Sequence, residues 1–210
     1  MWKKQNTLKL SCLILGVILF GNSCTSTSCN QNDKNASITH DNQEKSFTDE
    51  SIFHLESKWF TEEGEKIKLD QLKGKVLVIV MIYTTCKAAC PRLVADIKAI
   101  HDLIPEINRN KIQFVLVSID PEHDTPQRLK SFAIAKEMDD PEWTFLQGNT
   151  ETVREFANVL SVKYKEISPI DFSHSNIISV FNTDGELLHQ QEGLGVNNTK
   201  TIETILKTIE

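Results

Sequence analysis

The chain has 210 residues, of which 29 are acidic and 23 are lysine or arginine, giving a formal net charge of −6. This acidic balance, without a basic cluster, argues against nucleic acid as a partner. Only two of the five cysteines follow residue 46, which is too few for a fold held together by disulfides. The remaining length suits one domain with its own core.

The start of the chain has the pattern of a secretory signal. Three lysines lie within the first nine residues, an apolar stretch covers 10–20, and small residues directly precede Cys24. The apolar stretch is shorter than the roughly 20 residues that span a bilayer. We therefore expect a signal peptide of the lipoprotein type over 1–23, with Cys24 as the lipidated residue. Cys29 is a second candidate for lipidation, and an uncleaved signal anchor is the main alternative.

The next segment separates this signal from the domain. Residues 24–46 are rich in Ser, Thr, Asn, Gln and Asp and contain almost nothing to bury. Such a composition predicts a flexible tether that leads to a single domain over 47–210. Together the segments predict an extracytoplasmic, membrane-anchored protein of the bacterial cell envelope that faces the periplasm.

The first part of the domain predicts strands. Residues 47–55 and 58–67 are expected to be extended, with a turn at Gly64, so that an N-terminal β-hairpin is added to the domain. One helical turn is expected over 69–72. The continuous aliphatic run over 76–82 predicts a central strand that is covered on both faces.

The rest of the domain alternates between helical and strand patterns. Helices are expected after Pro91, from a cap at Thr125 to about 138, over 150–160 and over 199–208, and strands over 112–119, 145–146, 177–181 and 187–191. The last two strands flank Asp184-Gly185, which is typical of a hairpin turn. This order predicts an α/β fold of the thioredoxin-like kind, with three layers (α/β/α) and a central mixed sheet.

Two cysteines, Cys86 and Cys90, follow the predicted central strand and directly precede Pro91. The helix after them places both sulfurs at a helix N-terminus, where unpaired amides and the helix dipole favour thiolate. Residues four apart share one helix face, so the pair suits a disulfide, a shared soft metal ion or two structural thiols. The residues alone leave these alternatives open.

Three motifs lie in order along the domain. They are Tyr-Thr-Thr-Cys-Lys-Ala-Ala-Cys-Pro at 83–91, Val-Ser-Ile-Asp-Pro-Glu-His-Asp-Thr-Pro at 117–126, and Asp-Phe-Ser-His-Ser at 171–175 before a hairpin. In their order and spacing they resemble the SCO/SenC family of membrane-tethered copper proteins. The chain departs from the family pattern at Lys87 and Ala89, between the cysteines, and at Ser173, where the family often has Asp before the histidine.

The resemblance implies a metal site. In the family two cysteines and one histidine bind one copper ion, so the matching residues here are Cys86, Cys90 and His174. Thiolates select Cu(I), and one added imidazole also tolerates Cu(II). Asp124 and Asp171 are candidates for orienting the ligands through hydrogen bonds. For Asp124, helix capping is an equally good explanation.

The resemblance also implies a function: copper delivery to the dinuclear copper centre of cytochrome c oxidase, and help in its assembly. The expected partner is the copper-bearing oxidase subunit or another copper acceptor. The alternative is an extracytoplasmic thiol–disulfide oxidoreductase, in which Cys86 and Cys90 act on partner cysteines and a thiol reductant protein restores them. The sequence has no paired carboxylates or Ser-His-Asp set that would indicate a classical enzyme, and little around Cys86 indicates a peroxidase.

Overall fold

The computed structural model describes residues 48–87, 89–169 and 171–210. The expected signal peptide, the tether and Cys24 therefore lie outside the described residues. Within the described part, no helix is both long enough and apolar enough to cross a membrane.

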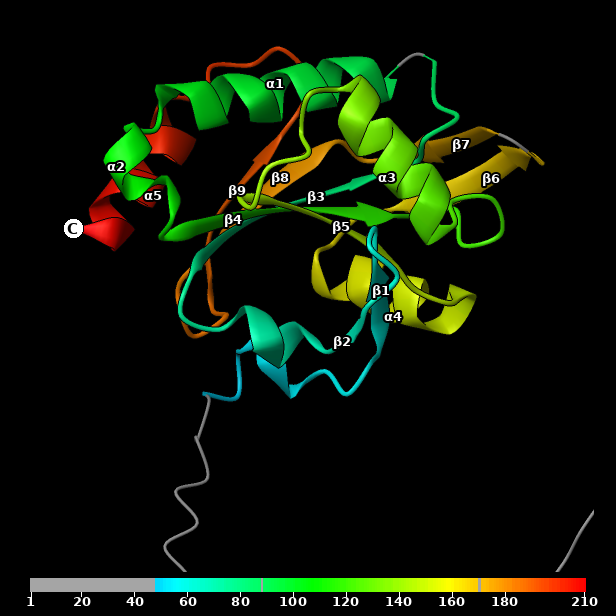
Figure 1. Ribbon diagram of the computed structural model, residues 1–210, viewed down its shortest axis with the longest axis horizontal. Helices are drawn as coiled ribbons and strands as arrows, with labels where there is room; N and C mark the ends of the chain where they lie inside the picture. The colour runs from blue at the N-terminus through cyan, green and yellow to red at the C-terminus, as the bar shows by residue number, and fades with distance from the viewer. Residues whose placement is uncertain (1–47, 88, 170) are drawn as a thin grey trace, which may run out of the picture. The chain divides into compact units, whose positions relative to one another are not determined.

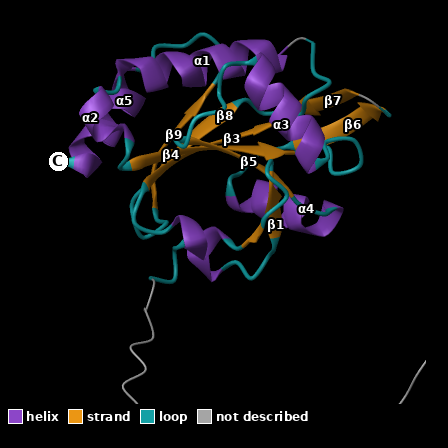
Figure 2. Ribbon diagram, viewed as in Figure 1, coloured by secondary structure: helices purple, strands orange, loops and turns teal. Residues whose placement is uncertain are grey.

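A mixed sheet forms the centre of the described domain (Figure 1, Figure 2). Its strand order is β2-β1-β5-β4-β3-β8-β9. The strands are β1 (Trp59–Thr61), β2 (Lys66–Ile67), β3 (Val76–Ile82), β4 (Ile112–Ser118), β5 (Trp143–Gln147), β8 (Ile177–Phe181) and β9 (Leu187–Glu192). The strands β3, β4 and β5 run parallel, whereas the hairpins β1–β2 and β8–β9 join the sheet in antiparallel pairings.

Helices cover both faces of this sheet. They are α1 (Ala89–Leu103), α2 (Glu106–Arg109), α3 (Pro126–Ala135), α4 (Thr150–Val159) and α5 (Thr199–Ile209), and a 3₁₀ helix, η2 (Leu69–Leu72), supplies the expected helical turn. Helices α1, α3 and α5 lie on one face of the sheet and α4 lies on the other (Figure 1). The expected three-layer α/β/α arrangement with a mixed central sheet is confirmed.

Strand β3 lies between β4 and β8, and all seven of its residues are buried. Its uninterrupted aliphatic sequence follows from this position, because a strand covered on both faces needs apolar side chains on both. The register between β3 and β4 pairs Ile82 with Ser118 at the carboxyl ends of the two strands. The segments 83–90 and 119–125, which leave these ends, therefore start side by side.

The expected strand over 47–55 is wrong. Ile52–His54 form a short 3₁₀ helix, η1, and the Ser51 hydroxyl caps it by accepting a hydrogen bond from the Phe53 N–H at 3.2 Å. The adjacent side chains of Ile52 and Phe53 are both buried. In a strand that packs on one face, neighbouring side chains point to opposite sides, so only one of the two would be buried. The expected hairpin over 58–67 is confirmed as β1 and β2.

Two further strands occur in a stretch for which the sequence predicts neither a helix nor a strand. β6 (Tyr164–Ser168) and β7 (Asp171–His174) pair antiparallel in a sheet of their own, which we call the ribbon. Most ribbon residues are exposed and polar, so they lack the apolar alternation that predicts a strand. The ribbon lies beyond the end of the central sheet, near the start of α1 (Figure 1). It carries His174 at its last position.

Candidate metal centre

Cys86 lies in the turn between β3 and α1 and is half-buried. Its Sγ accepts a hydrogen bond from the Cys90 N–H at 3.2 Å. The first N–H groups of a helix have no carbonyl partner within the helix, so this sulfur caps the start of α1. The N–H donor and the helix dipole both stabilise negative charge on the Cys86 sulfur.

Cys90, in the first turn of α1, is only 2% exposed. Burial raises the pKa of its thiol far above the ordinary value, and the neighbouring Cys86 sulfur adds to the increase. Loss of water thus outweighs the helix dipole at this position, and Cys90 keeps its proton near neutral pH. This finding corrects the expectation that the helix N-terminus favours thiolate at both sulfurs. The two cysteines are not joined by a disulfide.

His174 approaches the cysteine pair from the ribbon. Its Nε2 lies 3.6 Å from the Cys90 Sγ, and its Nδ1 lies 3.0 Å from the backbone oxygen of Ser175. A carbonyl oxygen only accepts hydrogen bonds, so Nδ1 carries the proton. Burial lowers the pKa of the imidazole, which keeps the ring neutral near pH 7. A neutral ring with its proton on Nδ1 directs the Nε2 lone pair towards the Cys90 sulfur.

Tyr83, the first residue after β3, holds the ribbon against the domain. Its hydroxyl donates to the Asp171 carboxylate at 2.5 Å and accepts from the Phe172 N–H at 3.2 Å. Its ring packs edge-on against the rings of Phe172 and His174, with centroids 5.2 and 5.8 Å away. Asp171 therefore contacts Tyr83, and it acts on His174 through that residue. Tyr83 is not among the residues predicted for the site, because nothing in its local sequence indicates a partner 88 residues away.

Asp124 is fully buried between β4 and α3. Its carboxylate accepts from the Thr84 N–H at 3.0 Å, from the Thr84 hydroxyl, and from the Ser118 hydroxyl at 2.7 Å. Burial raises the pKa of Asp124, and these three hydrogen bonds oppose the increase. The cap of α3 is Thr125, as expected, so capping does not account for Asp124. Asp124 ties the turn that carries Cys86 to the end of β4.

The site is open on the side of the imidazole. His174 lines a surface hollow of about 420 Å³, together with Ser173, Asn176 and Glu192. Cys90 closes the opposite side, because its sulfur is part of the buried core. A partner molecule can therefore approach His174 from the surface, while Cys90 stays shielded from water.

The three expected ligands lie next to one another, since Cys86 contacts Cys90 and Cys90 contacts His174. Two sulfurs and a neutral imidazole are donors that suit copper. Among residues 48–87, 89–169 and 171–210, however, no group of three or more His, Cys, Asp or Glu side chains is gathered closely enough to hold a metal ion as it stands. Binding one ion would require the three donors to move closer together.

The mixed three-layer fold, with a cysteine pair between the central strand and the first long helix, defines a thioredoxin-like protein. A family model described as SCO1/SenC matches residues 48–210, which is most of the chain. The chain belongs to the SCO1/SenC family.

Individual relatives agree with this assignment. The SCO1 protein homolog of Bacillus subtilis is 28% identical over 141 residues, which are 66% of this chain and 72% of that protein. Bradyrhizobium japonicum ScoI with copper bound has a TM-score of 0.62 at 21% identity, over 72% of this chain and 96% of that one. BsSco, a member of the Sco family of cytochrome c oxidase assembly proteins in which a disulfide switch was identified, has a TM-score of 0.62 at 24% identity, over 72% and 90%. The two structures share the fold of this chain.

Proposed function

We propose that this protein binds one copper ion through Cys86, Cys90 and His174 and delivers it to the dinuclear copper centre of a cytochrome c oxidase. The observation that carries the proposal is the 3.6 Å approach of the His174 Nε2 to the Cys90 Sγ, between residues 84 positions apart. Family membership supports copper as the cargo, because ScoI of the same fold binds it. The assembly role of BsSco supports the oxidase as the destination.

The proposed ligand set suits both oxidation states of copper. Two thiolates give a Cu(I) complex with a net charge of −1, and the start of α1 stabilises that charge. Cu(II) makes the complex neutral and gains most from the imidazole, which is the harder donor of the set. His174 is therefore the ligand on which Cu(II) depends most.

Transfer to an acceptor follows from the unequal exposure of the ligands. Cys86 is half-buried and His174 lines a surface hollow, whereas Cys90 is buried. An acceptor ligand can thus replace His174 and Cys86 first, and Cys90 is the last to release the ion. This exchange requires no catalytic acid or base.

The same proposal includes attachment to a membrane on the extracytoplasmic side. Cleavage before Cys24 and lipidation of that residue would leave 24–46 as a tether for the domain. Mass spectrometry of protein extracted from membranes tests this part, since cleavage removes 1–23 and the lipid adds mass at Cys24. A mass equal to that of the whole unmodified chain would favour an uncleaved anchor.

Metal titration followed by native mass spectrometry tests the ligands. We expect one Cu(I) or one Cu(II) per chain for the reduced wild type, and loss of both with Cys86→Ser or Cys90→Ser. His174→Ala should lose Cu(II) much more than Cu(I). His189→Ala, which changes a histidine on β9, is the matched control and should bind as the wild type does. Unchanged Cu(II) binding by His174→Ala would contradict the ligand assignment.

Thiol–disulfide exchange is the second candidate function, favoured by the contrast between the two thiols. Cys86 is accessible and its sulfur accepts an N–H, while Cys90 is buried and protonated. The Cys86 thiolate would attack a partner disulfide and form a mixed disulfide. Cys90 would lose its proton and attack the Cys86 sulfur, releasing the reduced partner and leaving a Cys86–Cys90 disulfide. A thiol reductant protein would then restore both thiols.

Reduction of insulin by the apo-protein separates the two functions. An oxidoreductase needs both cysteines but not the imidazole, so His174→Ala should keep its full rate while Cys90→Ser accumulates mixed disulfide. Copper delivery instead predicts slow insulin reduction, and transfer of Cu(II) that fails in all three variants, Cys86→Ser, Cys90→Ser and His174→Ala.

A further inference from the structure

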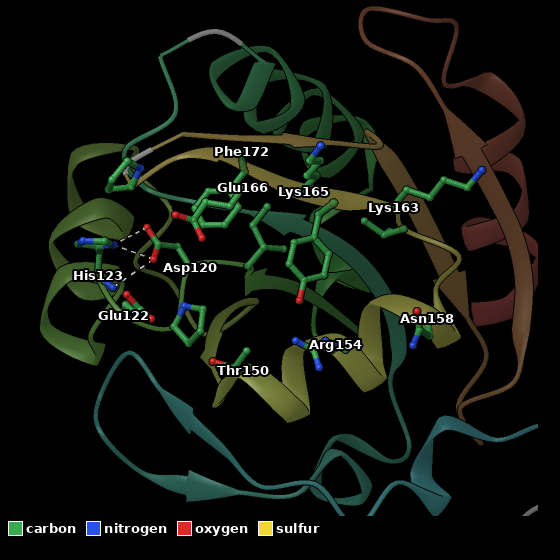
Figure 3. A pocket seen from close by; sticks show the side chains of 15 residues that line it. Asp120, Glu122, His123, Thr150, Arg154, Asn158, Lys163, Lys165, Glu166 and Phe172 are labelled. Atoms are coloured by element: carbon green, nitrogen blue, oxygen red, sulfur yellow. Dashed lines mark hydrogen bonds and ion pairs between the residues drawn. The ribbon is translucent and has the colours of Figure 1, made fainter.

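A cavity of about 520 Å³ lies between the ribbon, α4 and the loop after β4 (Figure 3). Its volume falls within the range of about 300–1,000 Å³ that is usual for small-molecule sites. The ribbon separates its walls from the hollow at His174, with Tyr164 lining both. The proposed copper chemistry makes no use of this cavity.

The floor of the cavity is apolar. Ile119 and Val162 are buried there, and the half-buried aromatic rings of Tyr164 and Phe172 complete it. Phe172 faces the cavity while its backbone N–H is held by Tyr83, so this wall is fixed to the domain. An apolar group of a ligand would lose water on contact with this floor, which favours binding.

Charged groups lie on opposite sides of the floor. Arg154, on α4, stands at one side together with Lys163 and Lys165, and Glu166 and Glu122 stand towards the other (Figure 3). None of these five side chains forms an ion pair with any residue that the structure describes. Asp120 also lines the cavity, but its carboxylate is already paired with the ring of His123 at 2.9 Å.

This charge pattern restricts the ligand. An anion without a positive group would leave the two glutamates without a partner, and a simple cation would leave Arg154, Lys163 and Lys165 without one. A neutral apolar molecule would cover the charged groups without replacing their water. A molecule with a carboxylate at one end, an ammonium group at the other and an apolar group between them complements the positive side, the negative side and the apolar floor of the cavity.

We propose that this cavity binds a short peptide with free ends. Its terminal carboxylate contacts Arg154, whose planar guanidinium suits a carboxylate in a two-point contact. Its terminal ammonium contacts Glu166 and Glu122. An apolar side chain between the ends packs on Tyr164 and Phe172. The site needs no copper and does not depend on the proposed delivery function.

Calorimetric titration of the apo-protein with Gly-Phe, Gly-Phe-Gly and Gly-Phe-Gly-Gly tests the proposal. We expect at least one peptide to bind with a Kd below about 1 mM, and amidation or acetylation of its ends each to weaken binding about threefold to tenfold. Arg154→Gln should reduce the effect of amidation, since Lys163 and Lys165 remain, while keeping the effect of acetylation. Glu166→Gln should reduce the effect of acetylation and keep that of amidation.

The matched controls are Lys207→Gln and Glu203→Gln, which make the same charge changes on the far helix α5 and should leave all affinities unchanged. Hydrogen exchange gives an independent readout, since the bound peptide should slow exchange in β6 and β7. Failure of all three peptides to bind would overturn the proposal. Equal binding of free and doubly blocked peptides would overturn it too, because the cavity would then recognise an internal segment and not free ends. Neither outcome would affect the copper assignment.

Discussion

The Tyr83 hydroxyl and the Asp171 carboxylate are hydrogen-bonded at 2.5 Å and join the end of the central strand to the ribbon. A sheet of two strands alone is marginally stable in water, so such a contact decides where the ribbon lies. His174 follows Asp171 by three positions, and its ring packs on the ring of Tyr83. The distance between His174 and the cysteines therefore depends on Tyr83.

Tyr83→Phe should loosen the ribbon while leaving the ring contacts in place. We expect a loss of about 1 kcal/mol in the free energy of unfolding, a small value because Asp171 is exposed and water replaces part of the lost bond. If the proposed ligands are right, Cu(II) affinity should fall more than Cu(I) affinity, since only the imidazole is displaced. Denaturant unfolding and copper titration measure the two effects.

Tyr164→Phe is the control for this substitution, because it removes the same hydroxyl from a neighbouring tyrosine on the ribbon. It should change neither stability nor Cu(II) affinity. If the two variants behave alike, Tyr83 has no special part in holding His174.

The buried His174 should make the apo-protein less stable in acid. Its pKa is lowered in the folded state, so between that lowered value and the unfolded value near 6.5 the unfolded chain binds more protons. The contribution of His174 to the free energy of unfolding is therefore largest above about pH 7. It falls as the pH decreases, by at most about 1.4 kcal/mol per pH unit. His174→Gln should reduce the loss of unfolding free energy between pH 7.5 and pH 5.

Comparing the wild type with His174→Gln isolates this effect, because the other titrating groups contribute equally to both proteins. Asp124 acts in the opposite direction, since its raised pKa makes the folded state bind more protons than the unfolded state. Denaturant titrations at both pH values, with the exposed His54→Gln as control, measure the difference. An identical pH slope for wild type and His174→Gln would show that the ring is solvated.

Cu(I) affinity should rise with pH. Cys90 is protonated near neutral pH and must lose its proton to bind copper, so the ion competes with a proton. One released proton gives up to about a tenfold gain in affinity per pH unit. Competition of the wild type with a Cu(I) chelator between pH 6 and pH 8 measures the slope. An affinity that does not change over this range would mean that copper binding releases no proton from Cys90.

Asp124→Asn should destabilise the domain strongly. The substitution places an NH₂ group among donors, so at least one of the N–H and hydroxyl groups of Thr84 and Ser118 loses its acceptor inside the protein. We expect a loss of about 2–3 kcal/mol in the free energy of unfolding. The exposed Asp140→Asn is the control and should lie within about 0.5 kcal/mol of the wild type. A loss of that small size for Asp124→Asn would mean that the network relaxes around the amide.

The parts of this protein that local sequence determines were predicted well. The aliphatic run over 76–82 is the buried β3, and the cysteines after it lie at the start of α1 as expected. The ribbon was missed because it is held by contacts at a distance rather than by apolar alternation. His174 was found only through the family resemblance, since the residues next to it in the sequence are typical of a surface loop. The thiolate expectation failed at Cys90 because burial, which opposes the helix dipole, depends on the whole fold.

The ribbon is a separate pair of strands inserted between α4 and β8, and the seven strands of the main sheet pair with one another without it. A chain lacking these residues would keep its thiol pair and its scaffold but have no imidazole beside them. Gain or loss of this one short insertion would therefore add or remove the third of the proposed copper ligands. Grafting this insertion onto a thioredoxin-like host is a direct way to build a third donor next to an existing dithiol.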